Sequence, residues 1–269
     1  MNRLPTSLVL RIVEFYTEPV YQLLHWIPIE HLDLTYVYAH PHAMDLIQKK
    51  THYMNWEILC RNPNAIPLLE ANMDKINWFE LSGNPGALPL LEANMDKICW
   101  SILSFNPNAI PLIEANLDKI DWYGLSANPN AIPLIEANMD KVLWDPLSTN
   151  PNAIHILTAN LDKINWVMLS SNPNAIHLLE ANQDKIHSIW MTRNPHIVSI
   201  IKKGVIPVDM SRFGWTDWSN FCKHPESIPF LQAHPEYINW YGFSKNPAIF
   251  EMNRKEMRKR SIDITLRLL

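Results

Sequence analysis

The carboxylate and amine side chains that could carry acid–base chemistry recur at one fixed position along the chain. Six Asp-Lys pairs follow one another at intervals of 22 residues: Asp74-Lys75, Asp96-Lys97, Asp118-Lys119, Asp140-Lys141, Asp162-Lys163 and Asp184-Lys185. A catalytic site needs convergent polar groups that differ from their surroundings, whereas these pairs repeat the same groups at every step. We therefore expect turn residues and solvated ion pairs, each of which stabilises the fold little, and no catalytic residues.

The histidines, the Lys-Lys-Gly stretch and the cysteines lack the neighbouring residues that a metal site, a phosphate loop or a disulfide framework needs. His155 and His177 occupy equivalent positions and could share a metal, but no third ligand is in phase with them, so we expect surface histidines. The Lys202-Lys203-Gly204 stretch lacks the flanking pattern of a phosphate loop. The chain has 3 cysteines, too few and too scattered for a disulfide framework or a zinc site. We predict no metal and no cofactor.

The charge and the apolar content of the chain argue against nucleic acid and membranes as partners. A formal net charge of −4 gives no general attraction to nucleic acid or to an anionic membrane. Periodic tryptophans could stack on bases, but this needs a basic groove, and acids and bases alternate evenly along the chain. We therefore expect these tryptophans in the core. The apolar runs are far shorter than the roughly 18 residues of a membrane-spanning helix. We expect no nucleic acid, no membrane, no secretory signal and a cytoplasmic location.

The elements that position these residues come from an internal repeat. Asn-Pro recurs every 22 residues from Asn62 to Asn194, and the same register runs back to His40-Pro41. The next copy is delayed by eight residues to His224-Pro225. Tryptophan keeps the same interval, with Ser188 in its place in one copy: Trp56, Trp78, Trp100, Trp122, Trp144, Trp166, Trp218 and Trp240. Nearly the whole chain is therefore one array.

Each copy predicts two short helices. In NPNAIPLLEAN, Pro67 falls in the first turn if Asn64 is the N-terminal cap, so we favour Asn64 over Asn62. Asn72 stands where a left-handed residue ends the helix. The second helix has Trp78 and Leu81 on one face and begins after a good cap residue in four copies: Asn77, Asp121, Asn165 and Asn239. A buried strand would instead alternate in polarity.

Such short helices are stable only when stacked, so we predict an all-α solenoid of about ten repeats. With helix layers roughly 8–10 Å apart, the array would be on the order of 90 Å long, or less if it coils. We divide the chain into an N-terminal capping helix (1–17), a regular array (18–193), an irregular repeat with the insertion (194–223), the last repeats (224–250) and a basic C-terminal cap (251–269). In that cap, Ile262 is expected to face inward.

The phrase NPNAIPLLEANMDKINWFELS resembles the repeat of array proteins encoded by giant DNA viruses of protists and algae. The resemblance covers roughly residues 40 to 250. It implies a viral protein made in the host cytoplasm, and no enzymatic activity comes with it. Near the start, LPTSLVLRIVEF is similar to the opening of an F-box, which implies an adaptor that joins substrates to a ubiquitin ligase.

Positions that vary between copies should be free of packing demands and therefore exposed. At the position of Phe79 the other copies carry Ser101, Tyr123, Asp145, Val167 and Tyr241. A constant scaffold with a variable surface suits extended recognition. We predict a non-enzymatic scaffold that binds a protein partner, of host origin if the viral resemblance holds, through Phe79, Tyr123 and Tyr241.

The irregular stretch from His187 to Trp218 supplies further candidates for partner binding, because Trp and Arg dominate interface energetics. They are Trp190, Arg193, Arg212 and Trp215. The alternative interpretation is a kink between two stacks, in which Trp190 or Trp215 refills the volume of the missing tryptophan. Two other functions stay open: a structural component of a virus particle, and an F-box-like adaptor that acts through residues 1–17.

Overall fold

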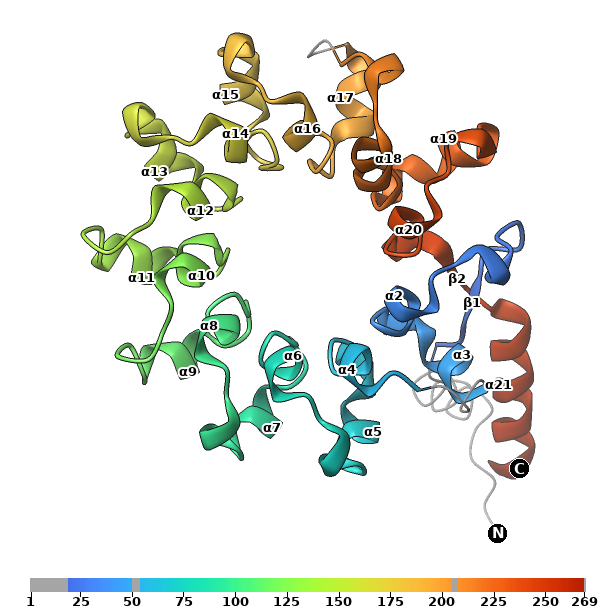
Figure 1. The fold of residues 1–269 in the computed structure, drawn as a ribbon. Coiled ribbons are helices and arrows are strands. Elements are labelled where there is room, and N and C mark those ends of the chain that lie inside the picture. Colours follow the sequence, from blue (N-terminus) through green and yellow to red (C-terminus); the bar gives the residue numbers. More distant parts are fainter. Residues whose placement is uncertain (1–18, 50–53, 205–207, 269) are drawn as a thin grey trace.

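The computed structural model describes residues 19–49, 54–204 and 208–268 of the chain. Over these ranges the repeats follow a closed ring made of two concentric rows of short helices (Figure 1). The prediction of an all-α solenoid with two short helices per repeat is confirmed. The capping helix and the F-box likeness predicted within residues 1–17 lie outside the described residues.

The inner row consists of the helices that begin at the periodic tryptophan position, except that α18 begins three residues before Trp218. They are α2 Leu34–Tyr38, α4 Trp56–Leu59, α6 Trp78–Ser82, α8 Trp100–Leu103, α10 Trp122–Ala127, α12 Trp144–Thr149, α14 Trp166–Leu169, α16 Ser188–Met191, α18 Trp215–Cys222 and α20 Trp240–Phe243. The outer row is α3 Met44–Lys49, α5 Ile66–Glu70, α7 Leu88–Glu92, α9 Ile110–Glu114, α11 Ile132–Ala137, α13 Ile154–Thr158, α15 Ile176–Glu180, α17 Ile197–Lys203 and α19 Ile228–Ala233.

The inner helices begin as the sequence predicts. Asn77 Oδ1 accepts the backbone N–H of Phe79 at 3.1 Å, and Asp121 Oδ1 accepts that of Tyr123 at 2.9 Å. Asn165 and Asn239 cap α14 and α20 in the same way. These side chains satisfy donors that the first helical turn leaves free, so the predicted caps are confirmed.

The outer helices begin and end differently from the prediction. Asn62, not Asn64, accepts a backbone N–H (that of Asn64, 2.9 Å), and α5 starts only at Ile66, which leaves Pro67 in the first turn. At the other end, Asn72 has φ −142° and is not left-handed. Its Nδ2 donates to the carbonyl of Leu68 at 2.9 Å. The side chain thus satisfies a terminal carbonyl, and the backbone needs no left-handed turn.

A ladder of buried asparagines joins each repeat to the one before it. Asn84 Nδ2 donates to the carbonyls of Asn62 (3.0 Å) and Cys60 (2.8 Å). The same pair of bonds, to backbone 22 and 24 residues earlier, recurs at Asn62, Asn106, Asn128, Asn150, Asn172, Asn194 and Asn246. In the copy after the insertion, His224 takes this position and donates from Nε2 to Thr192 O at 2.9 Å. These bonds satisfy backbone groups that the short helices leave open.

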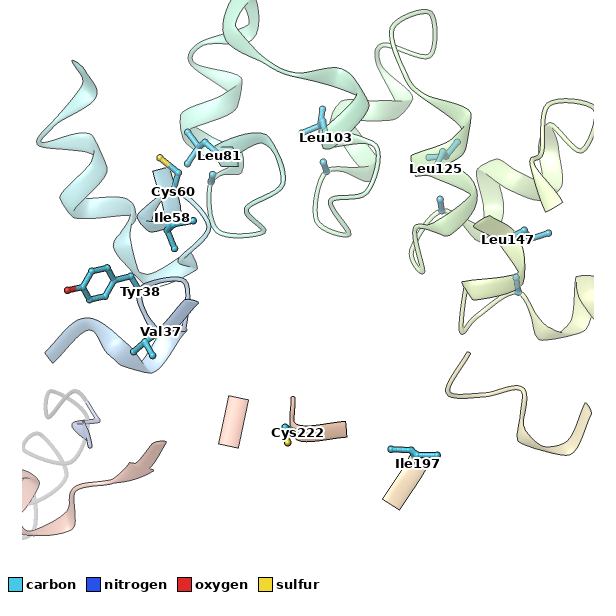
Figure 2. Close-up of a cluster of buried hydrophobic side chains, with 14 of the residues drawn as sticks. Val37, Tyr38, Ile58, Cys60, Leu81, Leu103, Leu125, Leu147, Ile197 and Cys222 are labelled. Atoms are coloured by element: carbon cyan, nitrogen blue, oxygen red, sulfur yellow. The ribbon is translucent and has the colours of Figure 1, made fainter. Parts of the chain in front are cut away.

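One fully buried apolar residue from each inner helix forms the centre of the core, and in α4 to α14 it is a leucine. Leu81, Leu103, Leu125 and Leu147 are fully buried at equivalent places in successive repeats (Figure 2). The periodic tryptophans, predicted as core residues, are only half-buried against this cluster. Between the repeats, the hydroxyl of Ser82 accepts the N–H of Cys99 at 2.9 Å, a bond that recurs with a 17-residue separation.

The first repeat packs on the last and closes the ring. Ser244 Oγ accepts the N–H of Asp33 at 2.8 Å, which is the bond that Ser82 makes to its following repeat. His40, at the ladder position of the first repeat, donates from Nε2 at 2.9 Å to the carbonyl of Pro247, the residue that follows the last ladder residue Asn246. Strand β1 (Tyr21–Leu23) pairs antiparallel with β2 (Phe250–Met252). The curvature of the array, which the sequence left open, therefore brings the two ends of the chain together.

The C-terminal helix α21 (Arg254–Leu268) lies outside the ring beside this closure (Figure 1). Arg260 forms an ion pair with Asp45 at 3.2 Å, and Asn253 N donates to Val20 O at 2.7 Å. Ile262, expected to face inward, is 60% exposed. Since the ring has no free end at this place, α21 has no open end of the stack to cover.

Candidate protein-interaction surface

The variable positions of the inner row form the candidate surface. Phe79 is 52% exposed, Tyr123 44% and Tyr241 39%, although each directly follows a tryptophan that packs on the core. The prediction that these positions are exposed is confirmed. They lie on α6, α10 and α20, so Phe79 and Tyr123 are on a different arc of the ring from Tyr241 (Figure 1).

An aromatic cluster gathers where the ring closes. The rings of Trp215 and Tyr241 lie 5.4 Å apart, and the Tyr36 hydroxyl donates to the Tyr241 hydroxyl at 2.9 Å. Lys245 Nζ lies 3.9 Å from the centre of the Tyr36 ring and 3.7 Å from that of Tyr241. The structure thus brings together two predicted site residues, Trp215 and Tyr241, with two that sequence analysis missed. Tyr36 and Lys245 could be found only by knowing that the first repeat meets the last.

The other candidates of the irregular stretch divide into two places. The Arg193 guanidinium lies 4.2 Å from the centre of the Trp190 ring, so these two form a cation–π pair at α16. Arg212 lines a cavity of about 420 Å³ beside Ser188. The alternative in which Trp215 refills the missing volume is wrong, since Trp215 is 64% exposed. Trp190 does not line that cavity either.

The lysines of the repeated Asp-Lys pairs contact tryptophan rings, a role that the sequence did not suggest. Lys97 Nζ lies 4.8 Å from the centre of the Trp78 ring in the preceding repeat, and this contact recurs at Trp100, Trp122, Trp144 and Trp166. The predicted Asp-Lys ion pair occurs at Asp74 and Lys75, which lie 3.0 Å apart. The constant spacing of Lys and Trp, 19 residues, was the available signal. These lysines cover the solvent side of the half-buried indoles.

Buried titratable groups of the inter-repeat contacts are held neutral. Burial lowers the pKa of His224 to about 4, and it lowers the pKa of His40 in the same direction. Burial raises the pKa of Cys222 to about 11, and its Sγ accepts the N–H of Asn239 at 3.3 Å. Cys222 thus stands at the Ser82 position as a hydrogen-bond acceptor, and a thiol that stays protonated is a poor nucleophile. None of these groups converges on a common cleft.

Comparison with known proteins finds no match: no family model, no curated protein sequence and no solved structure matches this chain. Within the described ranges, none of the helices has both the length and the apolar character needed to cross a membrane. Across the same ranges, no three His, Cys, Asp or Glu side chains stand together as metal ligands would.

Proposed function

We propose that this protein is a non-enzymatic ring scaffold that binds another protein through the exposed variable positions of its inner row. The observation that carries the proposal is that the inner helices of the regular repeats combine constant residues that pack on the core with a variable residue that is exposed. Trp78 and Leu81 pack on the core in a form repeated around the ring, whereas Phe79 between them is exposed and differs from copy to copy. Packing explains the constant residues but gives no reason for exposed aromatic side chains.

The aromatic cluster of Trp215, Tyr241 and Tyr36 is where we place the largest share of the binding energy. Trp and Tyr dominate the energetics of interfaces when they are well supported, and Lys245 and the Tyr36–Tyr241 hydrogen bond hold these rings in place. A preorganised aromatic surface loses little side-chain entropy on binding. The resemblance of the repeat supports a viral origin, a host partner, and a location in the host cytoplasm or in the virus particle.

Partner capture from host lysate tests the proposal. A variant with Phe79→Ser, Tyr123→Ser and Tyr241→Ser places at three copies the residue that Ser101 already provides at that position. We expect it to recover at least tenfold less partner than the natural protein, with thermal unfolding used to check that the ring is intact. A matched control changes exposed residues of the outer row, Glu70, Glu92 and Glu114, to serine. Equal recovery by the inner-row variant would overturn the proposal.

A further inference from the structure

In the regular repeats an indole occupies a fixed site between an inner helix and the turn that precedes the next one. Trp78 begins α6, and Lys97, the last residue of the turn Met95–Lys97, lies over its ring at 4.8 Å. Ile98 follows the lysine and is buried in the core. The same site, with a lysine 4.4–5.3 Å from the ring centre, is repeated at the next four tryptophans.

The repeat that begins with Ser188 keeps this site but lacks the indole. A cavity of about 420 Å³ lies there, with apolar walls that include Ile186, Met191, Val208 and Phe213. Arg212 is the last residue of the turn Met210–Arg212 before α18, as Lys97 is before α8, and it also lines the cavity. The cation of the regular site is thus present although the ring that it would cover is missing.

The cavity also holds an unused hydrogen-bond acceptor. Asp217 Oδ2 accepts the N–H of Gly214 at 3.0 Å, whereas Oδ1 is buried and has no hydrogen-bond partner among the described residues. Asp217 lines the cavity beside Ser188 and Arg212. A buried carboxylate oxygen without a partner is unfavourable, so a ligand that brings an N–H to this place gains a charge-assisted hydrogen bond.

We propose that this cavity binds an indole group, which takes the place of the tryptophan that the repeat lacks. Its ring lies against the apolar walls and under Arg212, and its N–H donates to Asp217 Oδ1. An apolar cavity of about 150 Å³ already suffices for benzene, so the available volume admits the larger two-ring system. The site adjoins the inner-row surface of the proposed function, because Ile189, the exposed residue after Ser188, also lines the cavity. Its binding of an indole does not depend on partner binding through Phe79, Tyr123 and Tyr241.

Binding of 5-fluoroindole to the full-length protein, followed by its ¹⁹F NMR signal, tests the proposal. We expect a Kd below about 1 mM, and at least tenfold weaker binding of 1-methyl-5-fluoroindole, which has no N–H. The amide of N-acetyl-5-fluorotryptophan distinguishes the two sources of an indole. Binding as tight as that of 5-fluoroindole assigns the site to a tryptophan on a partner chain, and much weaker binding assigns it to a free small molecule.

A matched pair of variants locates the site. Ser188→Trp restores the residue of the other repeats, and we expect it to abolish binding and to raise the Tm. Ser101→Trp adds the same side chain at an exposed position of α8 and should leave binding unchanged. Equal affinity of the natural protein and Ser188→Trp overturns the proposal. If Ser188→Trp does not fold, equal binding of the two fluoroindoles by the natural protein overturns it instead.

Discussion

At the scale of single residues, each junction between regular repeats contains a buried ladder asparagine, and we expect its loss to destabilise the ring more than the loss of an exposed asparagine. Asn128 donates to Asn106 O and Ser104 O, both at 3.0 Å, and its Oδ1 accepts the N–H of Asn130. Asn128→Ala leaves buried backbone groups unpaired, so we expect a loss of about 3 kcal/mol in the free energy of unfolding. Chemical denaturation measures it. Asn130→Ala, which removes one exposed bond to Pro107 O, is the control and should lose less than about 1 kcal/mol.

The same position makes stability depend on pH where histidine replaces asparagine. An unfolded histidine titrates near pH 6.5, whereas burial lowers the folded pKa of His224 to about 4. Its stabilising contribution is therefore complete above pH 6.5 and is lost as the pH falls toward 4. We expect a loss of about 2 kcal/mol between pH 7 and pH 5. His224→Asn restores the ladder residue and should flatten this dependence; an equal slope for both proteins would contradict the assignment. His40 is present in both and cancels from the difference.

The sequence contained the signal for this ladder, but the interpretation as a helix cap obscured it. Asn62 and Asn64 appear as rival caps when one copy is read alone. Across copies, the first position changes only to His40 and His224 in the described repeats, and both asparagine and histidine donate an N–H. A cap needs an acceptor, which serine or aspartate would also supply. The presence of histidine at this position therefore indicates that the side chain donates a hydrogen bond. The acceptor, a backbone carbonyl of the preceding repeat, can be identified only in the structure.

At the scale of elements, the approach of α20 to α18 depends on a glycine. A Cβ atom added to Gly242 would lie 2.0 Å from Ser219 O and 2.6 Å from Ser219 C, both backbone atoms that cannot rotate away. Gly242→Ala must therefore push the two helices apart, and we expect a loss of roughly 3 kcal/mol in the free energy of unfolding. Gly214→Ala is the control, because its Cβ would meet only Asp217 Oδ2 at 3.8 Å. Similar midpoints of thermal denaturation for the two variants would contradict this packing argument.

The type and order of the helices could be predicted because the same local sequence pattern recurs in successive repeats. Caps such as Asn77, the Trp78–Leu81 face and the exposed Phe79 follow from short-range chemistry. The pairing of Trp215 with Tyr241, and of both with Tyr36, could not be predicted in this way. It depends on the rotation between neighbouring repeats, since a small constant rotation accumulates along the array. Identical copies imply that this rotation is constant but do not give its size.

At the scale of the whole molecule, ring closure is one more copy of the ordinary junction, reinforced by a strand pair. Ser244 Oγ holds Asp33 N as Ser148 Oγ holds Asn165 N, at 2.8 Å and 3.0 Å. The two junctions differ in their covalent connection. The chain runs directly from the repeat of Ser148 to that of Asn165, whereas only non-covalent contacts join the last repeat to the first. Weakening either junction lowers stability, but only the terminal one can open the ring.

A pair of variants separates these two effects. Leu24→Pro with Ser244→Ala removes the N–H that Leu24 donates to Ile249 O (2.9 Å) and the acceptor for Asp33 N. We expect small-angle X-ray scattering to show a larger maximum dimension for this variant, because an open arc spans more than a closed ring. Ser148→Ala removes the equivalent acceptor inside the array and should keep the dimension of the natural protein while lowering its Tm. If both variants scatter as the natural protein does, the terminal contacts do not hold the ring, and closure follows from the curvature of the repeats alone.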